Sequence, residues 1–338
     1  MAASTLTTLQ DSFNSSTWKD IVAGEFTDKL GLLTAGAMQE ASGISSQDRG
    51  FYVEMPKWQS ISGDSVPITD GLSTTVNPHD NYTDRGVWCE REKSWGADQI
   101  LRVVTGYDPQ AEVARQIGQY LAVELHKQAV SVITGCFATE LGTTHSTGSD
   151  FSGAEIEVTG ILASKQKLGD NQDQLTIALL NSKPYQDAMK AGILTQPVLN
   201  VSNEMYRSGM IGKLFGMDAT MTDKFTATAS VYPSYFCAPG AVVFKFRERP
   251  ASAQSAAIVT RINVGGIVAD LELYRAALTS GGQDVLIVRY SALTHIPGVR
   301  YDDTGGSNPT NTVLATGTSW TKVANDDKLI KIVELKTL

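Results

Sequence analysis

The chain has 338 residues, of which 42% are apolar and 19% charged, a globular composition that excludes disorder and collagen-like order. At about 150 residues per domain, this length predicts two folding units, each able to bury a core without disulfide or metal staples. The chain has 28 Lys and Arg and 36 Asp and Glu, so its net charge is −8. This charge argues against a protein that reads nucleic acid through a basic face, but it is compatible with a protein that surrounds nucleic acid.

The N-terminal residues 1–17 are rich in Ser and Thr and predict an extended arm. From Trp18 to about Ala41, apolar residues recur at helical spacing and predict a short amphipathic helix. The N-terminus lacks the basic and apolar regions of a secretory signal, and no run of 18 apolar residues occurs in the chain. We therefore expect a soluble protein that is made in a reducing compartment and has no membrane partner.

Residues 51–58 and 86–95 alternate between apolar and polar side chains, which predicts two strands. The residues between them are mostly Ser, Thr, Asp, Gly and Pro, and they predict a long two-stranded excursion. Its polar tip is placed at residues 60–84, and deletion of this tip is expected to leave both strands intact. Because a lone hairpin is marginally stable in water, we expect the excursion to lie against another surface.

The clearest predicted element is a helix over residues 108–138. Asp108 is placed to cap it, and Pro109 suits its first turn. Apolar residues then follow one stripe at spacings of three and four, and the predicted core-facing residues are Val113, Ile117, Leu121 and Leu125. At about 1.5 Å per residue, this helix is about 45 Å long.

The rest of the chain mixes strands and helices without a regular βαβ rhythm, so the predicted class is α+β. Strands are predicted at 175–181, 241–249, 284–293 and in LIKIVEL near the C-terminus, and helices from Pro184 to near Gly192 and over 268–278.

The sequence contains few motifs that are typical of catalysis or metal binding. Ser164 and Lys167 match S-x-x-K, which in some hydrolases pairs a serine nucleophile with a lysine base, but the companion motifs are absent. Cys136 and His145 are nine residues apart and form two ligands of a metal site without a third. The three cysteines, with Cys89 and Cys237 completing the set, form no disulfide framework. We expect no cofactor, no metal and no enzyme activity.

The excursion carries the most distinctive side chains. Trp58 and Trp88 stand among polar residues, and aromatic residues dominate the centres of interfaces. Charged residues surround them. We therefore predict contacts between chains through Trp58, Trp88, Arg85, Glu90, Arg91, Glu92 and Lys93. The alternative is that the tryptophans pack onto their own domain and that the charges form a solvated face.

The order of these elements resembles the major capsid proteins of tailed bacteriophages, which share the Hong Kong 97-type fold. The resemblance covers nearly the whole chain and includes the phrases YRSGMIGKLFGMDATMTD (206–223), RYSALTHIPGVRYDD (289–303) and NPTNTVLATGTSWTKV (308–323). It implies an N-terminal arm and helix at 1–42, an extended β-hairpin loop at 43–95, a peripheral domain at 96–154 and 240–338 with a spine helix at 108–138, and an axial domain at 155–239.

The resemblance also implies a function. The chain is expected to form hexamers and pentamers that close into an icosahedral shell around double-stranded DNA, without sequence-specific binding. Scaffold, portal and decoration proteins are the implied further partners. The implied location is the virion capsid, after assembly in the host cytoplasm. Two alternatives remain at this stage, an encapsulin-like nanocompartment of the same fold and a hydrolase that uses Ser164 and Lys167.

Overall fold

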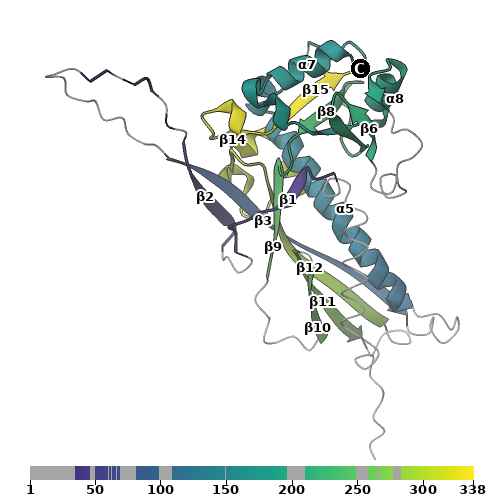
Figure 1. Cartoon of the computed structure of the whole chain (residues 1–338). Coiled ribbons are helices and arrows are strands. Elements are labelled where there is room, and N and C mark those ends of the chain that lie inside the picture. The colour runs from purple at the N-terminus through teal and green to yellow at the C-terminus, as the bar shows by residue number, and fades with distance from the viewer. Residues whose placement is uncertain are drawn as a thin grey trace, which may run out of the picture.

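The computed structural model of the chain describes residues 35–45, 50–59, 61, 63–65, 67–68, 81–98, 109–148, 150–195, 210–248, 258–264, 266–276 and 283–338. These residues form one sheet of nine strands, one sheet of six strands, and a long helix that runs from one sheet to the other (Figure 1). Helices and strands are interspersed, so the predicted α+β class is confirmed. Within the described residues, no helix is long and apolar enough to cross a membrane.

The nine-stranded sheet is built around two long strands, β3 (Asn81–Asp98) and β12 (Gln283–His295). One side of β12 pairs with β9 (Val242–Arg247) and β11 (Ile267–Ala276), and the other side pairs with β3. The remaining strands are β1 (Met38–Glu40), β2 (Tyr52–Trp58), β10 (Ile258–Val264), β13 (Val299–Tyr301) and β14 (Trp320–Lys322). The predicted strands at 51–58, 86–95, 241–249 and 284–293 are therefore confirmed.

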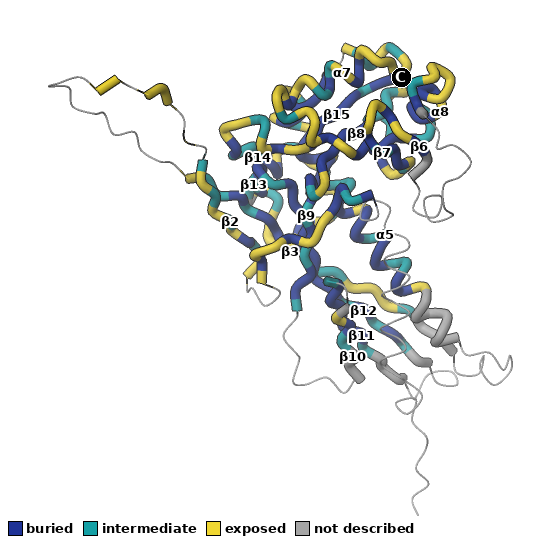
Figure 2. Tube along the Cα trace, in the orientation of Figure 1, coloured by how far each residue is buried: buried dark blue, intermediate teal, exposed yellow. Residues whose placement is uncertain are grey.

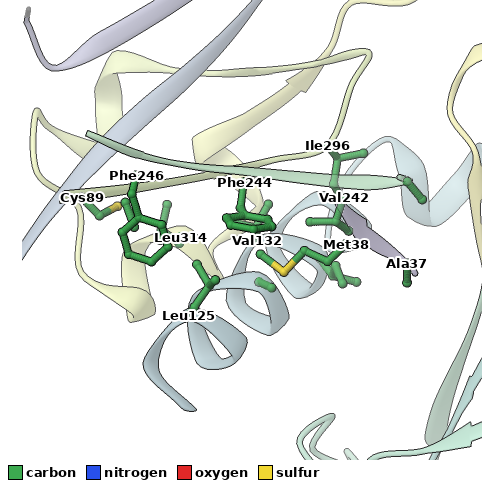
Figure 3. Packing of buried hydrophobic residues seen from close by; sticks show 14 of the residues in the cluster. Ala37, Met38, Cys89, Leu125, Val132, Val242, Phe244, Phe246, Ile296 and Leu314 are labelled. Atoms are coloured by element: carbon green, nitrogen blue, oxygen red, sulfur yellow. The ribbon is translucent and has the colours of Figure 1, made fainter. Parts of the chain in front are cut away.

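The predicted long helix is confirmed as α5 (Pro109–Phe137). The side chains of Ile117, Leu121 and Leu125 are at most 1% exposed, which confirms them as core residues, whereas the side chain of Val113 lies outside the described residues. Figure 3 shows Leu125 and Val132 of α5 beside Phe244, Phe246 and Met38 from the nine-stranded sheet. Burial of this stripe is what fixes the helix on the sheet.

A close approach near the end of α5 requires a glycine. A Cβ atom on Gly135 would lie 2.0 Å from the carbonyl oxygen of Leu314 and 2.7 Å from Trp320 Nε1. The Trp320 Nε1 group donates a hydrogen bond to that same carbonyl, at 2.7 Å. The short helix α10 (Asn311–Leu314) and strand β14 therefore pack directly against α5.

The six-stranded sheet has the order β15-β8-β4-β7-β6-β5 and its own apolar core. Three shorter helices belong to this half of the chain. The bounds are α6 (Leu141–Thr144), α7 (Val158–Gln166), β4 (Ile177–Leu180), α8 (Ser182–Lys190), β5 (Leu194–Thr195), β6 (Met210–Leu214), β7 (Met217–Met221), β8 (Tyr232–Cys237) and β15 (Ile332–Thr337). The predicted strands at 175–181 and near the C-terminus are confirmed, and the helix predicted from Pro184 begins two residues earlier.

Three predictions about the elements need correction. Residues 268–278 were predicted to be helical, but Ile267–Ala276 form strand β11 between β10 and β12. The N-terminal helix does not reach Ala41, because Met38–Glu40 pair in parallel with β9; residues 1–34 lie outside the described residues. The grouping of residues 240–338 into one unit fails at β15, which pairs with β8 in the six-stranded sheet.

Candidate assembly surfaces

The excursion is a hairpin that extends the central strand of the larger sheet. Strand β2 pairs with β3 from Tyr52 opposite Val87 to Trp58 opposite Asn81. From Trp88 onward, β3 pairs with β12 instead. The hairpin therefore projects from the rest of the subunit while its root is continuous with the sheet (Figure 1). The predicted tip at 60–84 is too long, because β3 already begins at Asn81.

A buried carboxylate holds the root of this hairpin. The Asp84 side chain is fully buried, and its Oδ2 accepts from Lys57 Nζ at 2.7 Å and from the Gly298 backbone N–H at 2.9 Å. The imidazole of His295 lies 3.9 Å from the same oxygen. Burial alone would raise the pKa of Asp84, but His295, Lys57 and the Gly298 N–H together bring it below its ordinary value of 3.8. The hairpin is thus joined to β12 and to the turn before β13.

This arrangement predicts an acid-dependent loss of stability. Because the pKa of Asp84 is lower in the folded state, its contribution is present above about pH 3.8 and is lost as the pH falls through the folded-state value. We expect Asp84→Asn to lower the free energy of unfolding at pH 7 by about 1–3 kcal/mol. Urea unfolding from pH 7 to pH 3 should give a shallower decline for the variant; equal slopes would contradict the assignment.

The two tryptophans predicted to contact other chains differ in their exposure. Trp58, at the outer end of β2, is 68% exposed, and it stays a predicted contact residue. Trp88 is fully buried among Val53, Leu293 and their neighbours, with the Arg247 guanidinium 5.1 Å from its ring. The prediction of a contact between chains is therefore wrong for Trp88, which packs within its own subunit as the alternative stated.

The charged residues on β3 form ion pairs mostly with residues of the same subunit. Arg85 Nη2 lies 3.1 Å from Glu54 Oε1 across the hairpin. Glu90 Oε1 lies 2.7 Å from Arg247 Nη2 on β9. These pairs tie the hairpin and the adjacent strands to one another, so Arg85 and Glu90 have structural partners beside any contact with another chain.

Two of the next charged residues of β3 also have partners within the subunit, and two are exposed to solvent. Arg91 Nη1 donates to Asn308 Oδ1 at 3.1 Å. Glu92 Oε2 accepts from Arg289 Nε on β12 at 3.0 Å, although Glu92 is exposed. Lys93 is exposed as well. Of the predicted contact residues, Trp58, Glu92 and Lys93 are thus the ones with most of their surface available.

Exposed apolar side chains continue past Trp58 into the described part of the hairpin end. Ile61 is 89% exposed and Ile68 is fully exposed. Figure 2 draws this part of the chain as exposed and far from both sheets. Apolar groups held away from their own subunit in this way are typical of surfaces that another chain covers.

A cavity of about 540 Å³ lies where the end of α5 meets the six-stranded sheet. Its apolar wall is formed by Phe137, Phe225, Val231 and Pro233. At the polar side, the buried Tyr235 hydroxyl donates to Glu334 Oε1 at 3.1 Å. Burial first, and the Glu334 carboxylate second, raise the pKa of this tyrosine well above its usual value.

A second cavity of about 430 Å³ adjoins the first, and the two share Thr134, Thr226 and Thr228. It carries the two amines of Lys127 and Lys224. We refer to the two cavities together as the α5 groove. Sequence analysis missed it because its walls come from α5, from residues 224–235 and from the last strand, and no local pattern connects these segments.

The residues considered for catalysis or metal binding have structural roles in the folded chain. Ser164 is fully buried, and its hydroxyl donates to the Gly160 carbonyl at 2.8 Å, whereas Lys167 is exposed, so a substrate cannot reach the pair. Cys136 is buried in the apolar core. Both ring nitrogens of His145 have partners, Thr144 Oγ1 at 2.7 Å and the Asp327 carbonyl at 2.8 Å. The arrangement contradicts the hydrolase alternative and provides no shared metal ligand pair.

Comparison with known proteins identifies relatives over most of the chain. Residues 100–330 match the sequence model of a family described as Gp13-like, major capsid protein 13-like. The major capsid protein of Bacillus phage SPP1 is 23% identical over 299 residues, which cover 85% of this chain and 83% of that protein.

Solved structures show a similar fold at low sequence identity. The capsid of Ralstonia phage GP4 aligns with a TM-score of 0.54 and 12% identity, covering 81% of this chain and 86% of that one. The capsid of a native GTA particle aligns with a TM-score of 0.53 and 11% identity, covering 90% of each chain. The arrangement of two sheets and a long helix is therefore shared with proteins that form capsids.

Proposed function

The chain belongs to the Gp13-like family of major capsid proteins, and from this membership we propose that it is the structural subunit of an icosahedral shell around the double-stranded DNA of a tailed phage. Copies of the chain form hexamers and pentamers. Its role is to build the wall rather than to catalyse a reaction. The nanocompartment alternative draws no support from a family match to major capsid proteins.

We propose that the α+β fold is of the Hong Kong 97 type. In this assignment the β2–β3 hairpin is the extended loop, α5 is the spine helix, and the nine-stranded sheet forms the peripheral domain. The six-stranded sheet, including β15, forms the axial domain with α7 and α8. The TM-scores with two capsid chains support this assignment.

The observation that carries the proposal is the projecting hairpin. A monomeric protein gains nothing from holding Trp58 and Ile68 largely exposed on an arm away from both cores. A wall made of overlapping subunits needs such an arm, because the arm reaches a neighbour. The root held by Asp84 fixes its direction.

The charge of the chain fits a container for DNA. A net charge of −8 gives weak overall repulsion from phosphates, which fits DNA that is enclosed without tight binding. Scaffold, portal and decoration proteins are the further partners that we propose. The proposed location is the virion capsid, after assembly in the host cytoplasm.

Sedimentation of the purified full chain, alone and coexpressed with the phage's scaffold protein, tests this proposal. We expect closed or tubular particles of megadalton mass, and we expect intact shells to protect enclosed DNA from nuclease. A chain that sediments as a monomer or small oligomer under all these conditions would contradict the proposal.

A further inference from the structure

We propose that the α5 groove binds a purine nucleotide, with the base in the larger cavity and the phosphate in the smaller one. This inference goes beyond the proposed function, because the groove lies within one subunit and its occupation needs no second copy of the chain. It adds a ligand-binding site between the end of α5 and the six-stranded sheet, where β8 and β15 lie (Figure 1).

The polar edge of the larger cavity places a hydrogen-bond acceptor beside a donor. Glu334 lines this cavity and is 3% exposed, and its Oε1 accepts from the Tyr235 hydroxyl. Its Oε2 accepts no hydrogen bond from the described residues, although Lys336 Nζ lies 3.3 Å away. Buried carboxylate oxygens rarely lack a donor. A carboxylate next to an ammonium matches the edge of a nucleobase, which carries an N–H donor beside an acceptor.

The walls of the larger cavity suit the ring of a base. They include the apolar side chains of Phe137, Phe225, Val231 and Pro233. Aromatic and apolar side chains bind bases because the faces of the ring are apolar. The volume of about 540 Å³ is within the range of about 300–1,000 Å³ that is usual for small-molecule sites. The Lys336 side chain is 35% exposed, so it can turn aside and admit the edge of the base.

The smaller cavity supplies donors for a phosphate group. Its lining residues are Lys127, Val130, Ser131, Thr134, Lys224, Thr226, Thr228, Asn311 and Ala315, with no carboxylate among them. Lys127 already pairs with Glu124 at 2.6 Å, whereas Lys224 forms no ion pair with the described residues. Ammonium and hydroxyl groups are common donors to phosphate oxygens. Lys224 is therefore the main cation of the phosphate end.

The two ends of the groove differ in charge, and this difference fixes the orientation of the ligand. The Glu334 carboxylate repels an anion from the larger cavity, but it accepts hydrogen bonds from a neutral base. The Lys224 ammonium attracts the phosphate to the smaller cavity. Thr134, Thr226 and Thr228 line both cavities, so they lie where the sugar joins base and phosphate. A purine covers more of the apolar wall than a pyrimidine does, which favours a purine nucleotide.

Calorimetric titration of the full chain, freed of nucleic acid, with GMP and with guanosine tests both ends separately. Glu334→Gln should weaken the binding of both ligands about tenfold or more, because a hydrogen bond to a charged group is lost at the base. Lys224→Met should weaken GMP by a similar factor and leave guanosine unchanged. The matched controls, Glu157→Gln and Lys167→Met, remove the same charges at exposed positions at the two ends of α7 and should change neither affinity.

Three results would overturn the inference. They are a wild-type chain that does not bind GMP, site variants that bind it no more weakly than the controls, and an affinity for inorganic phosphate equal to that for GMP. Lys224 is exposed, so Lys224→Met should keep the Tm of the wild type and carries the test even if Glu334→Gln lowers it. Particles that form normally without binding GMP would leave the proposed function standing.

A further titration distinguishes two sources of the ligand. A single-stranded oligodeoxyguanosine that binds more tightly than GMP, with the same loss in Lys224→Met, would place the nucleotide in the enclosed DNA. Weaker binding than that of GMP would identify a free nucleotide. Both outcomes support the nucleotide site, and an oligonucleotide whose binding is unaffected by Lys224→Met would contradict its phosphate end.

Discussion

Leu121→Asp is expected to abolish the soluble subunit. Leu121 is 1% exposed, within the apolar cluster between α5 and the nine-stranded sheet. A carboxylate there has no partner and no water, so the substitution should cost at least about 3–5 kcal/mol. Since domains are stable by about 5–15 kcal/mol, we expect most of the variant to be in inclusion bodies. The soluble fraction after expression and the Tm of any soluble protein measure this effect.

Gln116→Asp is the matched control for Leu121→Asp. Gln116 lies on the same helix, five residues earlier, and is exposed. The same charge at this position should leave the yield and the Tm close to those of the wild type. A Leu121→Asp variant that behaves like Gln116→Asp would mean that the stripe on α5 does not form the core.

Replacement of residues 59–80 by Asn-Gly is expected to separate folding from assembly. Trp58 and Asn81 are paired across the hairpin, so a two-residue turn can join the strands directly. The replacement keeps Asp84 and both strands, unlike a deletion of residues 60–84. We expect an unchanged Tm and a particle yield lowered more than about tenfold, since the loss of one contact of about 1.4 kcal/mol already weakens a single association tenfold.

A second replacement distinguishes the length of the hairpin end from its chemistry. A Gly-Ser linker of equal length restores the reach but supplies neither the apolar side chains nor the aspartates. We expect it to fail in assembly as the short turn does. Normal particles from the Asn-Gly variant would contradict the role of the hairpin in joining subunits, whatever the linker variant does.

The sequence predicted the elements whose patterns are local. The stripe through Ile117, Leu121 and Leu125 identified α5, because burial on one side of a helix imposes its period on the residues. The alternation in residues 51–58 and 86–95 identified β2 and β3 in the same way. These patterns do not depend on which distant segment covers the buried side.

Strand β11 shows where local pattern fails. Its Ala, Leu and Glu residues favour a helix, but the strand is fixed by pairing with β10 and β12. Arg261 Nε contacts Asp270 Oδ1 at 2.7 Å from the neighbouring strand, and Arg289 Nη1 contacts Glu272 at 2.6 Å. These partners are 9 and 17 residues away along the chain, so helical propensity was outweighed by pairings that lie outside any local window.

The candidate surfaces were predictable only in part. Trp58 and Trp88 look alike in the sequence, but β3 continues past Val87 into the sheet, and this buries Trp88 while Trp58 stays outside. The α5 groove escaped prediction altogether, since Glu334 and Phe137 meet only in the folded chain. Local sequence patterns do not reveal the register between strands that are distant in the chain.

The central claim, that this chain builds an icosahedral shell, is tested most directly by electron microscopy of the purified particles with symmetry analysis of the images. The account predicts closed shells with five-fold vertices and six-fold rings, in which each ring position is one copy of the chain. Images that show only small oligomers, or particles without five-fold symmetry even when the scaffold protein is present, would contradict it.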